Sequence, residues 1–217
     1  ARGNGSTDDT VAIQAALTFA AAQLGSVVYV PYGVYLVSSP LLIGDFTTLM
    51  GDMRDSSTIK ATHTGDCLYS TATINTSTVK RILIEHISFL TVTASTGGGY
   101  VDVAGTEICI RDCTFTGFKY GMILDQSEVV EVARCRFELQ GKTASIWLVN
   151  GDDHTVGASM GFTNLITIYG CHFNSNTVGI HIQDDGGSNH IIRDNNINGA
   201  ATGIRVANTS NLTVEDN

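Results

Sequence analysis

The sequence predicts an all-β protein that folds as a parallel β-helix, a solenoid closed at its N-terminal end by one capping α-helix. A spaced pattern occurs six times: an apolar residue, then Ile, Cys or Asn three places later, then an aromatic or apolar residue two further. The six copies are Ile84–Ile87–Phe89, Ile110–Cys113–Phe115, Val132–Cys135–Phe137, Ile168–Cys171–Phe173, Ile192–Asn195–Ile197 and the incomplete Val214–Asn217. They follow one another at steps of 26, 22, 36, 24 and 22 residues. Such a period is typical of a solenoid, whose repeats bury their apolar faces against one another.

The composition agrees with this fold and excludes other classes. Of the 217 residues 23 are Gly, 2 are Pro and 15% are charged, which is typical of a turn-rich all-β chain. The net charge is −9 and Lys and Arg form no cluster, so we expect no nucleic-acid partner. No apolar stretch reaches the roughly 18 residues that a membrane span needs.

Residues 1–40 are expected to form the N-terminal cap. A helix is predicted over Asp9–Leu24, with Thr7 or Asp8 capping its first N–H groups and Gly25 ending it. Its apolar face is expected to contain Val11, Ala12, Ala15, Ala16, Phe19 and Ala20. Short strands are predicted over residues 26–31 and 34–37.

Residues 41–217 are expected to form the β-helix, and the chain stops inside a repeat, so we expect further rungs beyond it. Each rung is predicted to hold a second strand; these are Tyr100–Ala104, Met122–Asp125, Ser145–Asn150, Ile180–Asp184 and Ile204–Asn208. Ile59, 25 residues before Ile84, indicates an earlier rung. The side chains expected on the outer surface include His86, Asp112, Arg134, His172 and His190.

Three of the five cysteines occupy one repeat position, which predicts an internal column of Cys113, Cys135 and Cys171. Neighbouring rungs lie about 4.8 Å apart, so a disulfide is geometrically possible, but buried free thiols are the expected state. Asn195 and Asn217 continue the column and predict an asparagine ladder.

Two N-terminal segments resemble the opening of the pectate-lyase-3 superfamily. They are GNGSTDDTVAIQAAL (residues 3–17) and GSVVYVPYGVY (residues 25–35), which match its Thr-Asp-Asp-Thr helix start and its Pro-x-Gly-x-Tyr turn. The resemblance implies a right-handed parallel β-helix. It also implies a kinship with phage tailspike depolymerases, glycoside hydrolases, polysaccharide lyases and alginate epimerases. Tailspikes of this type are homotrimers, so a homotrimer is a possible state.

The second strands predict where a site lies. Because strand side chains alternate, Ile123, Trp147, His181 and Arg205 are expected in one outward column, with Asp102 before it. Trp147 is expected to stack on sugar rings, or else to pack under the loop over residues 150–164. The other expected substrate contacts are Gln183, Asn150 and His154.

Carboxylates near this column are candidates for acid–base chemistry: Asp125, Asp153, Asp184 and Asp185. Asp125 lies two rungs from Asp184 and Asp185, a separation that favours an inverting glycosidase pair. The alternative is that these residues only form turns. No cofactor is required, although Asp152, Asp153, Asp184 and Asp185 could bind Ca²⁺.

The resemblance, taken with these candidate residues, implies a phage tailspike- or depolymerase-like domain, extracellular or on the virion (phage tail). Such a domain would bind a surface or capsular polysaccharide and cleave it by carboxylate chemistry, as a hydrolase or a lyase. Two alternatives remain open. One is a secreted bacterial lyase or epimerase of the pectate or alginate type. The other is a structural or adhesive β-helix without catalytic activity.

Overall fold

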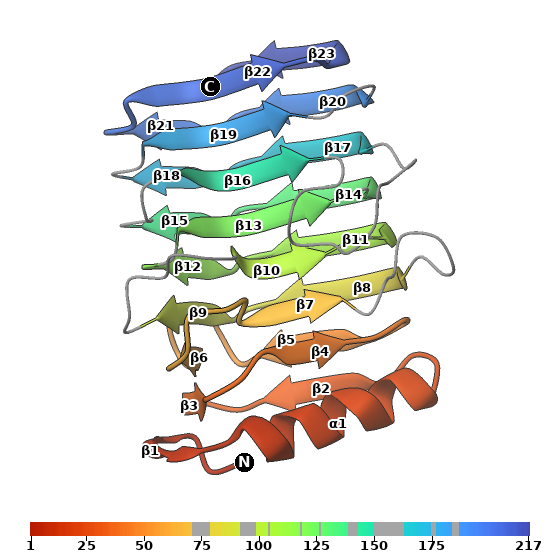
Figure 1. Cartoon of the computed structure of the whole chain (residues 1–217), viewed down its shortest axis with the longest axis vertical. Helices are drawn as coiled ribbons and strands as arrows, with labels where there is room; N and C mark the ends of the chain where they lie inside the picture. Colours follow the sequence, from red (N-terminus) through yellow and green to blue (C-terminus); the bar gives the residue numbers. More distant parts are fainter. Residues whose placement is uncertain are drawn as a thin grey trace.

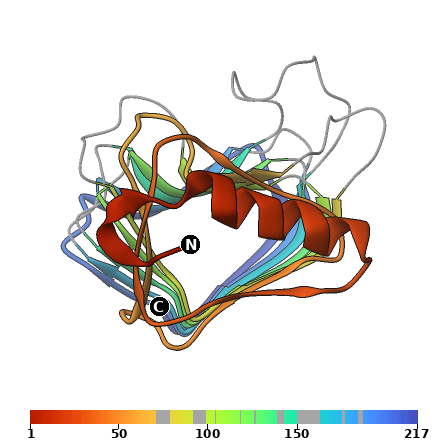
Figure 2. The same cartoon turned by 90° about the horizontal axis from the view of Figure 1, so that it is seen from below.

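The chain forms a right-handed parallel β-helix. The computed structural model describes residues 1–70, 79–91, 99–103, 105–117, 119–125, 127–138, 143–149, 163–174, 177–183 and 187–217. The strands stack rung upon rung along one axis (Figure 1), and they enclose a three-sided interior when seen along that axis (Figure 2). None of the helices among these residues has the length and apolarity needed to cross a membrane.

Three parallel sheets make up the sides of the solenoid. Sheet A contains β1 (Asn4–Asp8), β3 (Gly33–Val37), β6 (Ser57–Ala61), β9 (Ser88–Thr91), β12 (Thr114–Thr116), β15 (Arg136–Glu138), β18 (His172–Asn174) and β21 (Asn196–Asn198). Sheet B contains β2 (Val27–Val30), β5 (Thr48–Gly51), β8 (Val79–Glu85), β11 (Gly105–Arg111), β14 (Glu128–Ala133), β17 (Asn164–Tyr169), β20 (Ser188–Arg193) and β23 (Ser210–Glu215). Sheet C contains β4 (Leu41–Ile43), β7 (Leu68–Ser70), β10 (Gly99–Val103), β13 (Tyr120–Asp125), β16 (Ala144–Val149), β19 (Val178–Gln183) and β22 (Thr202–Ala207).

Each full rung therefore has three strands, in the order B, A, C along the chain. Sheet C is the predicted second strand of each rung. The aromatic position of the repeat lies on sheet A, a separate side of the solenoid. The earlier rung is present, but Ile59 pairs with Phe89, and the residue that pairs with Ile84 is Leu49.

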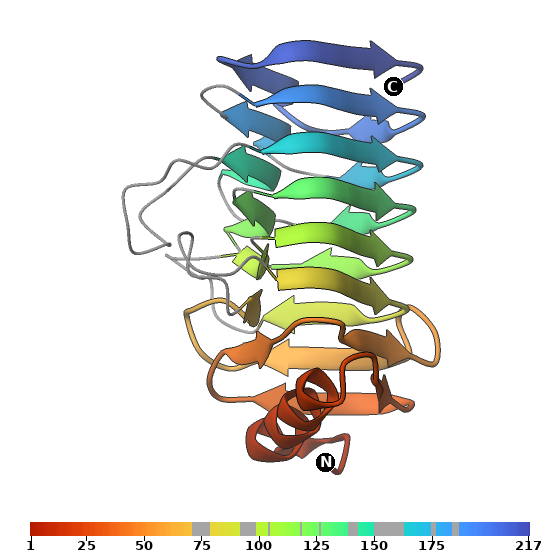
Figure 3. The ribbon, with the colours of Figure 1, turned by 90° about the vertical axis from the view of Figure 1, so that its right-hand side faces the viewer.

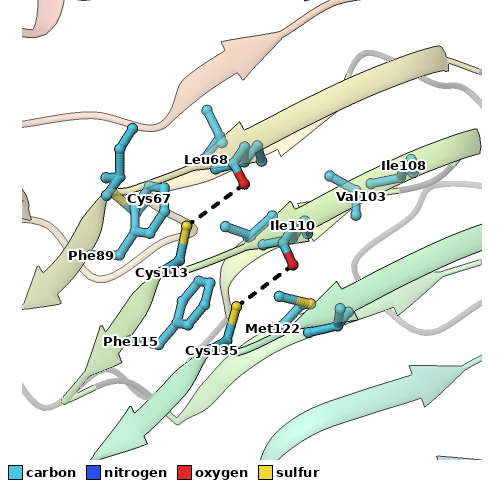
Figure 4. Close-up of a cluster of buried hydrophobic side chains, with 14 of the residues drawn as sticks. Cys67, Leu68, Phe89, Val103, Ile108, Ile110, Cys113, Phe115, Met122 and Cys135 are labelled. Atoms are coloured by element: carbon cyan, nitrogen blue, oxygen red, sulfur yellow. Dashed lines mark hydrogen bonds between the residues drawn. The ribbon is translucent and has the colours of Figure 1, made fainter. Parts of the chain in front are cut away.

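The repeat positions form continuous columns in the core. Phe89, Phe115, Phe137 and Phe173 are fully buried, and their rings stack at centroid distances of 5.4, 4.9 and 4.9 Å. Figure 4 shows two of these rings beside Cys113 and Cys135, which point into the same apolar interior. The repeat therefore places chemically similar side chains on top of one another along the axis.

The cysteine column is confirmed, and its thiols are free. The Sγ atoms of Cys113, Cys135 and Cys171 donate to the carbonyl oxygens of Ile84, Ile110 and Val132, at 3.7, 3.6 and 3.7 Å. Burial raises the pKa of the Cys113 and Cys171 thiols, so both stay protonated.

The asparagine ladder is confirmed as the polar continuation of this column. The Oδ1 of Asn195 accepts a hydrogen bond from the Cys171 N–H at 2.9 Å, and its Nδ2 donates to the Oδ1 of Asn217 at 2.8 Å. The ladder thus satisfies buried backbone groups at the turn from sheet B to sheet A.

The residue before each column position has a left-handed backbone. The φ of His86, Asp112, Arg134 and Asp194 lies between 52° and 59°. On the outside of this turn Arg134 donates two hydrogen bonds to Asp112, at 2.9 and 2.7 Å. The predicted surface pairing of these two residues is confirmed, whereas the prediction for His190 is wrong because it is buried in the core.

The N-terminal helix α1 (Thr10–Ala22) lies across the first rung (Figure 3) and is shorter than predicted. The predicted apolar face is wrong: Val11 and Phe19 are 83% and 65% exposed. The buried face consists of Thr10, Ile13, Leu17 and Ala20. Because α1 contains no charged residue, its apolar period does not distinguish one face from the other.

The two aspartates before α1 have different roles. The Oδ1 of Asp8 accepts a hydrogen bond from the Thr10 N–H at 3.0 Å, which confirms it as a capping residue. Hydrogen bonds from Ser38 and then Thr10 lower the pKa of Asp8 to about 2. Asp9 is buried, and its carboxylate accepts from the N–H groups of Arg2 and Gly3, so it holds the first residues against the cap.

Candidate functional site

The outer face of sheet C carries the predicted column. Ile123 pairs with Trp147, Trp147 with His181, and His181 with Arg205, which confirms the predicted register. Asp102 pairs with Ile123, so it belongs to the same column. A parallel column on the same face contains Asp125, Val149, Gln183 and Ala207.

The floor of this face is apolar. Outside the main core, Tyr120, Ile123, Ala144, Val149 and Val178 form a second buried cluster, and Trp147 packs against it. A mostly apolar floor with a few polar groups is the usual make-up of a ligand site. We call this surface the sheet C site.

Aromatic rings stack along the sheet C site. The Trp147 ring lies 4.8 Å from the Tyr120 ring and 6.2 Å from the His181 ring, centroid to centroid. The Nζ of Lys119 lies 4.9 Å from the centroid of Tyr120 at the lower end of the stack. Both faces of the indole are therefore covered by protein rings, and a sugar ring can meet Trp147 only at its edge.

One polar atom of this stack has no partner among the described residues. The Nε1 of Trp147 is buried and donates no hydrogen bond within the part of the chain that the structure describes. A buried donor without a partner costs free energy of about 1–3 kcal/mol. A hydroxyl of a bound ligand or a water molecule would relieve that cost.

His181 is half-buried, and burial followed by the charge of Arg205 lowers its pKa. The imidazole is therefore neutral at pH 7 and can accept or donate one proton. Arg205 is exposed and supplies a fixed positive charge one rung further along.

Two carboxylates on neighbouring strands are buried on this outer face. Asp125 is 1% exposed and Asp102 is 7% exposed. Asp102 pairs with Ile123, so the two aspartates are one strand apart and offset by two residues. Strand spacing then places their Cα atoms about 8 Å apart. Both side chains leave the same face of the sheet, so their carboxyl groups can reach the roughly 6.5–9.5 Å that separates the carboxyl groups of inverting glycosidases.

The remaining predicted site residues divide into two groups. Gln183 lies exposed at the end of β19. The others lie outside the described residues: Asn150, Asp152, Asp153, His154, Asp184 and Asp185. The proposed pairing of Asp125 with Asp184 or Asp185 therefore stays a prediction. Within the described ranges no three His, Cys, Asp or Glu side chains are grouped so as to hold a metal ion.

The sequence prediction did not include Lys119 and Tyr120 and gave Asp102 no catalytic role. Asp102 could have been found from the sequence. The alternation of side chains places it on the outer face, one rung before the rung that carries Asp125. Tyr120 was missed because it stands at the strand start, where the simple inward–outward alternation predicts an inward residue.

Comparisons with known proteins agree with this architecture. The family model described as "Rhamnogalacturonase A/epimerase, pectate lyase-like" matches residues 1–216. A stretch of 51 residues is 43% identical to the non-secreted LysM effector LysM19 of Penicillium expansum, which is 24% of this chain and 4% of that protein.

Several solved structures are similar in fold. PfbA, a surface adhesin of Streptococcus pneumoniae, has a TM-score of 0.70 at 19% identity, over 90% of this chain and 54% of that chain. ORF18 of Geobacillus virus E2 has a TM-score of 0.67 at 19% identity, over 92% of this chain and 40% of that chain. The catalytic unit of a GH87 α-1,3-glucanase from Streptomyces thermodiastaticus has a TM-score of 0.62 at 16% identity, over 97% and 40%. The chain thus spans about half or less of the length of these proteins.

Proposed function

The chain belongs to the rhamnogalacturonase A/epimerase, pectate lyase-like family, and on this premise we propose that it is a carbohydrate-active β-helix. It binds a polysaccharide on the sheet C site and acts on it by acid–base chemistry between Asp102 and Asp125. The observation that carries the proposal is the pair of buried carboxylates beside an apolar floor. Titratable groups buried in a ligand site are candidates for catalysis.

Glycoside hydrolysis is the reaction that two carboxyl groups support best. One carboxylic acid protonates the leaving oxygen of the glycosidic bond, and the other carboxylate removes a proton from the attacking water.

A lyase or epimerase is the second candidate, and His181 with Arg205 is the observation that favours it. Both reactions begin with removal of a proton next to a carboxylate, which needs a base and a cation that neutralises the substrate. His181, with its lowered pKa, is a neutral base, and Arg205 is the neighbouring cation.

The experiment is digestion of a panel of neutral and acidic polysaccharides, with mass spectrometry of the products. A hydrolase adds water at each cut, whereas a lyase leaves an unsaturated product that absorbs in the ultraviolet. We expect Asp102→Asn and Asp125→Asn each to lower the rate at least about 100-fold. Asp194→Asn is the matched control, because Asp194 is exposed on a turn away from sheet C.

Full activity in both variants would contradict the assignment of the pair. Binding to a polysaccharide without any product would instead support the adhesive alternative, in which the carboxylates have no catalytic role.

The fold similarity to a viral protein and to a surface adhesin supports an extracellular or virion location. A homotrimer is part of the same proposal, and light scattering of the purified chain tests it.

A further inference from the structure

We propose a second glycan-binding site, on a different side of the solenoid, that takes a neutral hexopyranose residue. A hollow of about 420 Å³ lies near the N-terminal end of sheet A, and its lining includes Asn4, Tyr32, Gly33, Asp55, Thr58 and Lys60. We call it the N-terminal pocket. Its size is within the range of small-ligand pockets, and the proposal does not depend on the chemistry of the sheet C site.

Asp55 supplies a positioned acceptor. Its Oδ1 accepts hydrogen bonds from Ser88 Oγ at 3.1 Å and Thr114 Oγ1 at 3.0 Å, which fix the carboxylate. Its Oδ2 lies 3.7 Å from Arg136 Nη1, beyond hydrogen-bond distance. The Oδ2 therefore keeps lone pairs for a ligand hydroxyl.

Lys60 supplies the donor. Its ammonium group forms no ion pair with any residue in the described ranges, so its three N–H bonds face solvent or a ligand. The pocket thus offers one acceptor, the Asp55 carboxylate, and one donor, the Lys60 ammonium. Vicinal hydroxyls, each of which donates and accepts, match this pair better than a charged sugar does.

Tyr32 supplies the stacking surface. It is 79% exposed, and no other ring covers it among the residues that the structure describes. Its backbone N–H donates to the Oδ2 of Asp52 at 2.6 Å, which fixes the turn between Pro31 and Gly33. A large exposed aromatic ring beside polar groups is suited to the apolar C–H face of a pyranose.

The surroundings favour a sugar that belongs to a longer glycan. Thr58 begins an outward column of polar residues along sheet A: Thr58, Ser88, Thr114, Arg136, His172 and Asn196. Ser88 and Thr114 are buried and donate to Asp55, so the groups that this column offers to the units following the one in the pocket are the guanidinium, imidazole and amide of Arg136, His172 and Asn196.

The test is amide chemical-shift perturbation on the full chain, titrated with methyl α-D-glucopyranoside, methyl β-D-galactopyranoside and methyl α-D-mannopyranoside, and with D-galacturonate as the charged comparison. We expect saturable shifts at Gly33, Thr58 and Lys60 with at least one neutral sugar, at millimolar Kd. Tyr32→Ala and Lys60→Met should each weaken binding at least about fivefold. Phe19→Ala, which removes another exposed aromatic ring, on α1, should leave it unchanged.

Absence of saturable shifts at these amides with all three neutral sugars overturns the proposal, as does unchanged binding in both pocket variants. Tighter binding of galacturonate than of every neutral sugar overturns the ligand class. Binding here by a chain that cuts no glycan would uphold this site and count against the proposed enzymatic function, so the two failures are distinguishable.

Discussion

At the scale of single residues, the second residue is small in four of the sheet C strands. The size of its side chain decides how closely sheet C packs on the phenylalanine column. The second residue of four consecutive sheet C strands is Gly121, Ser145, Gly179 or Gly203. A Cβ on Gly179 would lie 2.5 Å from the Gly203 carbonyl oxygen and 3.1 Å from Ile197 Cγ2. A Cβ on Gly203 would meet nothing nearer than 3.8 Å.

Gly179→Ala is therefore expected to destabilise the fold by about 1–3 kcal/mol, the usual cost of overpacking. Gly203→Ala is its matched control and should change the free energy of unfolding by less than about 0.5 kcal/mol. Urea denaturation followed by circular dichroism measures both. Equal effects of the two substitutions would show that the close contacts at Gly179 do not limit the packing.

A second single residue, His181, makes the free energy of unfolding depend on pH. Burial, and then the charge of Arg205, lowers its pKa below the ordinary value of 6.5. The unfolded chain then binds the proton more tightly than the folded chain, so this contribution is complete above about pH 6.5 and is lost as the pH falls through the lowered pKa. His181→Gln removes the titration.

The Tm of the wild-type chain minus that of His181→Gln should therefore be smaller at pH 5.5 than at pH 7.5. Thermal denaturation at the two pH values gives this difference. A Tm difference that does not change with pH would contradict the assignment to His181.

At the scale of elements, the strands of sheet B share a strained position near their start. The residue there has a positive φ in six consecutive strands: Arg81, Glu107, Val129, Leu165, Asn189 and Asn211. Asn adopts this left-handed conformation readily, whereas a β-branched residue does so at a cost. Val129 has a φ of 55° and is half exposed, so the burial of its side chain offsets little of this backbone strain.

Val129→Asn is expected to raise the free energy of unfolding by about 1 kcal/mol, because it relieves this strain. The control is Val27→Asn, at an exposed valine in β2 that has no positive φ. It should be neutral or slightly destabilising, because Asn is a poor strand former. If both substitutions lower the Tm alike, the left-handed position is not strained.

The elements also show where sequence reasoning succeeds. A column such as Cys113, Cys135 and Cys171 is predictable because every rung repeats one environment. Residues that lie one repeat apart in the sequence are therefore neighbours in the stack. The register of Trp147 with His181 follows for the same reason. The covered faces of the indole were not predictable, since Tyr120 joins the stack from a strand start. The buried face of α1 was not predictable either, because apolar residues occur all round the helix.

At the scale of the whole molecule, the three sides of the solenoid have separate surfaces. Sheet C presents the buried carboxylates, and sheet A presents the polar column that begins at Thr58. Because the rungs repeat at the spacing of β-strands, successive sugar units of a glycan can meet equivalent positions along one side. This match supports the proposed polysaccharide ligand.

Within residues 1–217 the first and last rungs differ in how much of their apolar surface is covered, and for a chain of these residues this predicts a gradient of stability. At the N-terminal end α1 covers the first rung, and Leu17 and Val30 are buried. In the last rung Val206 and Val214 are 47% and 48% exposed. In a solenoid each rung is stabilised mainly by its neighbours, so in a chain of residues 1–217 the rung that contains β22 and β23 should open most easily.

Hydrogen exchange on the chain of residues 1–217 tests this gradient. We expect the amides of β22 and β23 to exchange at least about tenfold faster than those of β13 and β14, since an opening that costs 1.4 kcal/mol less is ten times more frequent. The amides of β2 and β3 should be protected more than those of β22 and β23, because α1 covers that end. Leu17→Ala, which weakens the cover, should accelerate exchange in β2 and β3 and leave β22 unchanged. Uniform exchange along the axis would mean that the solenoid opens as one cooperative unit and that neither end is a weak point.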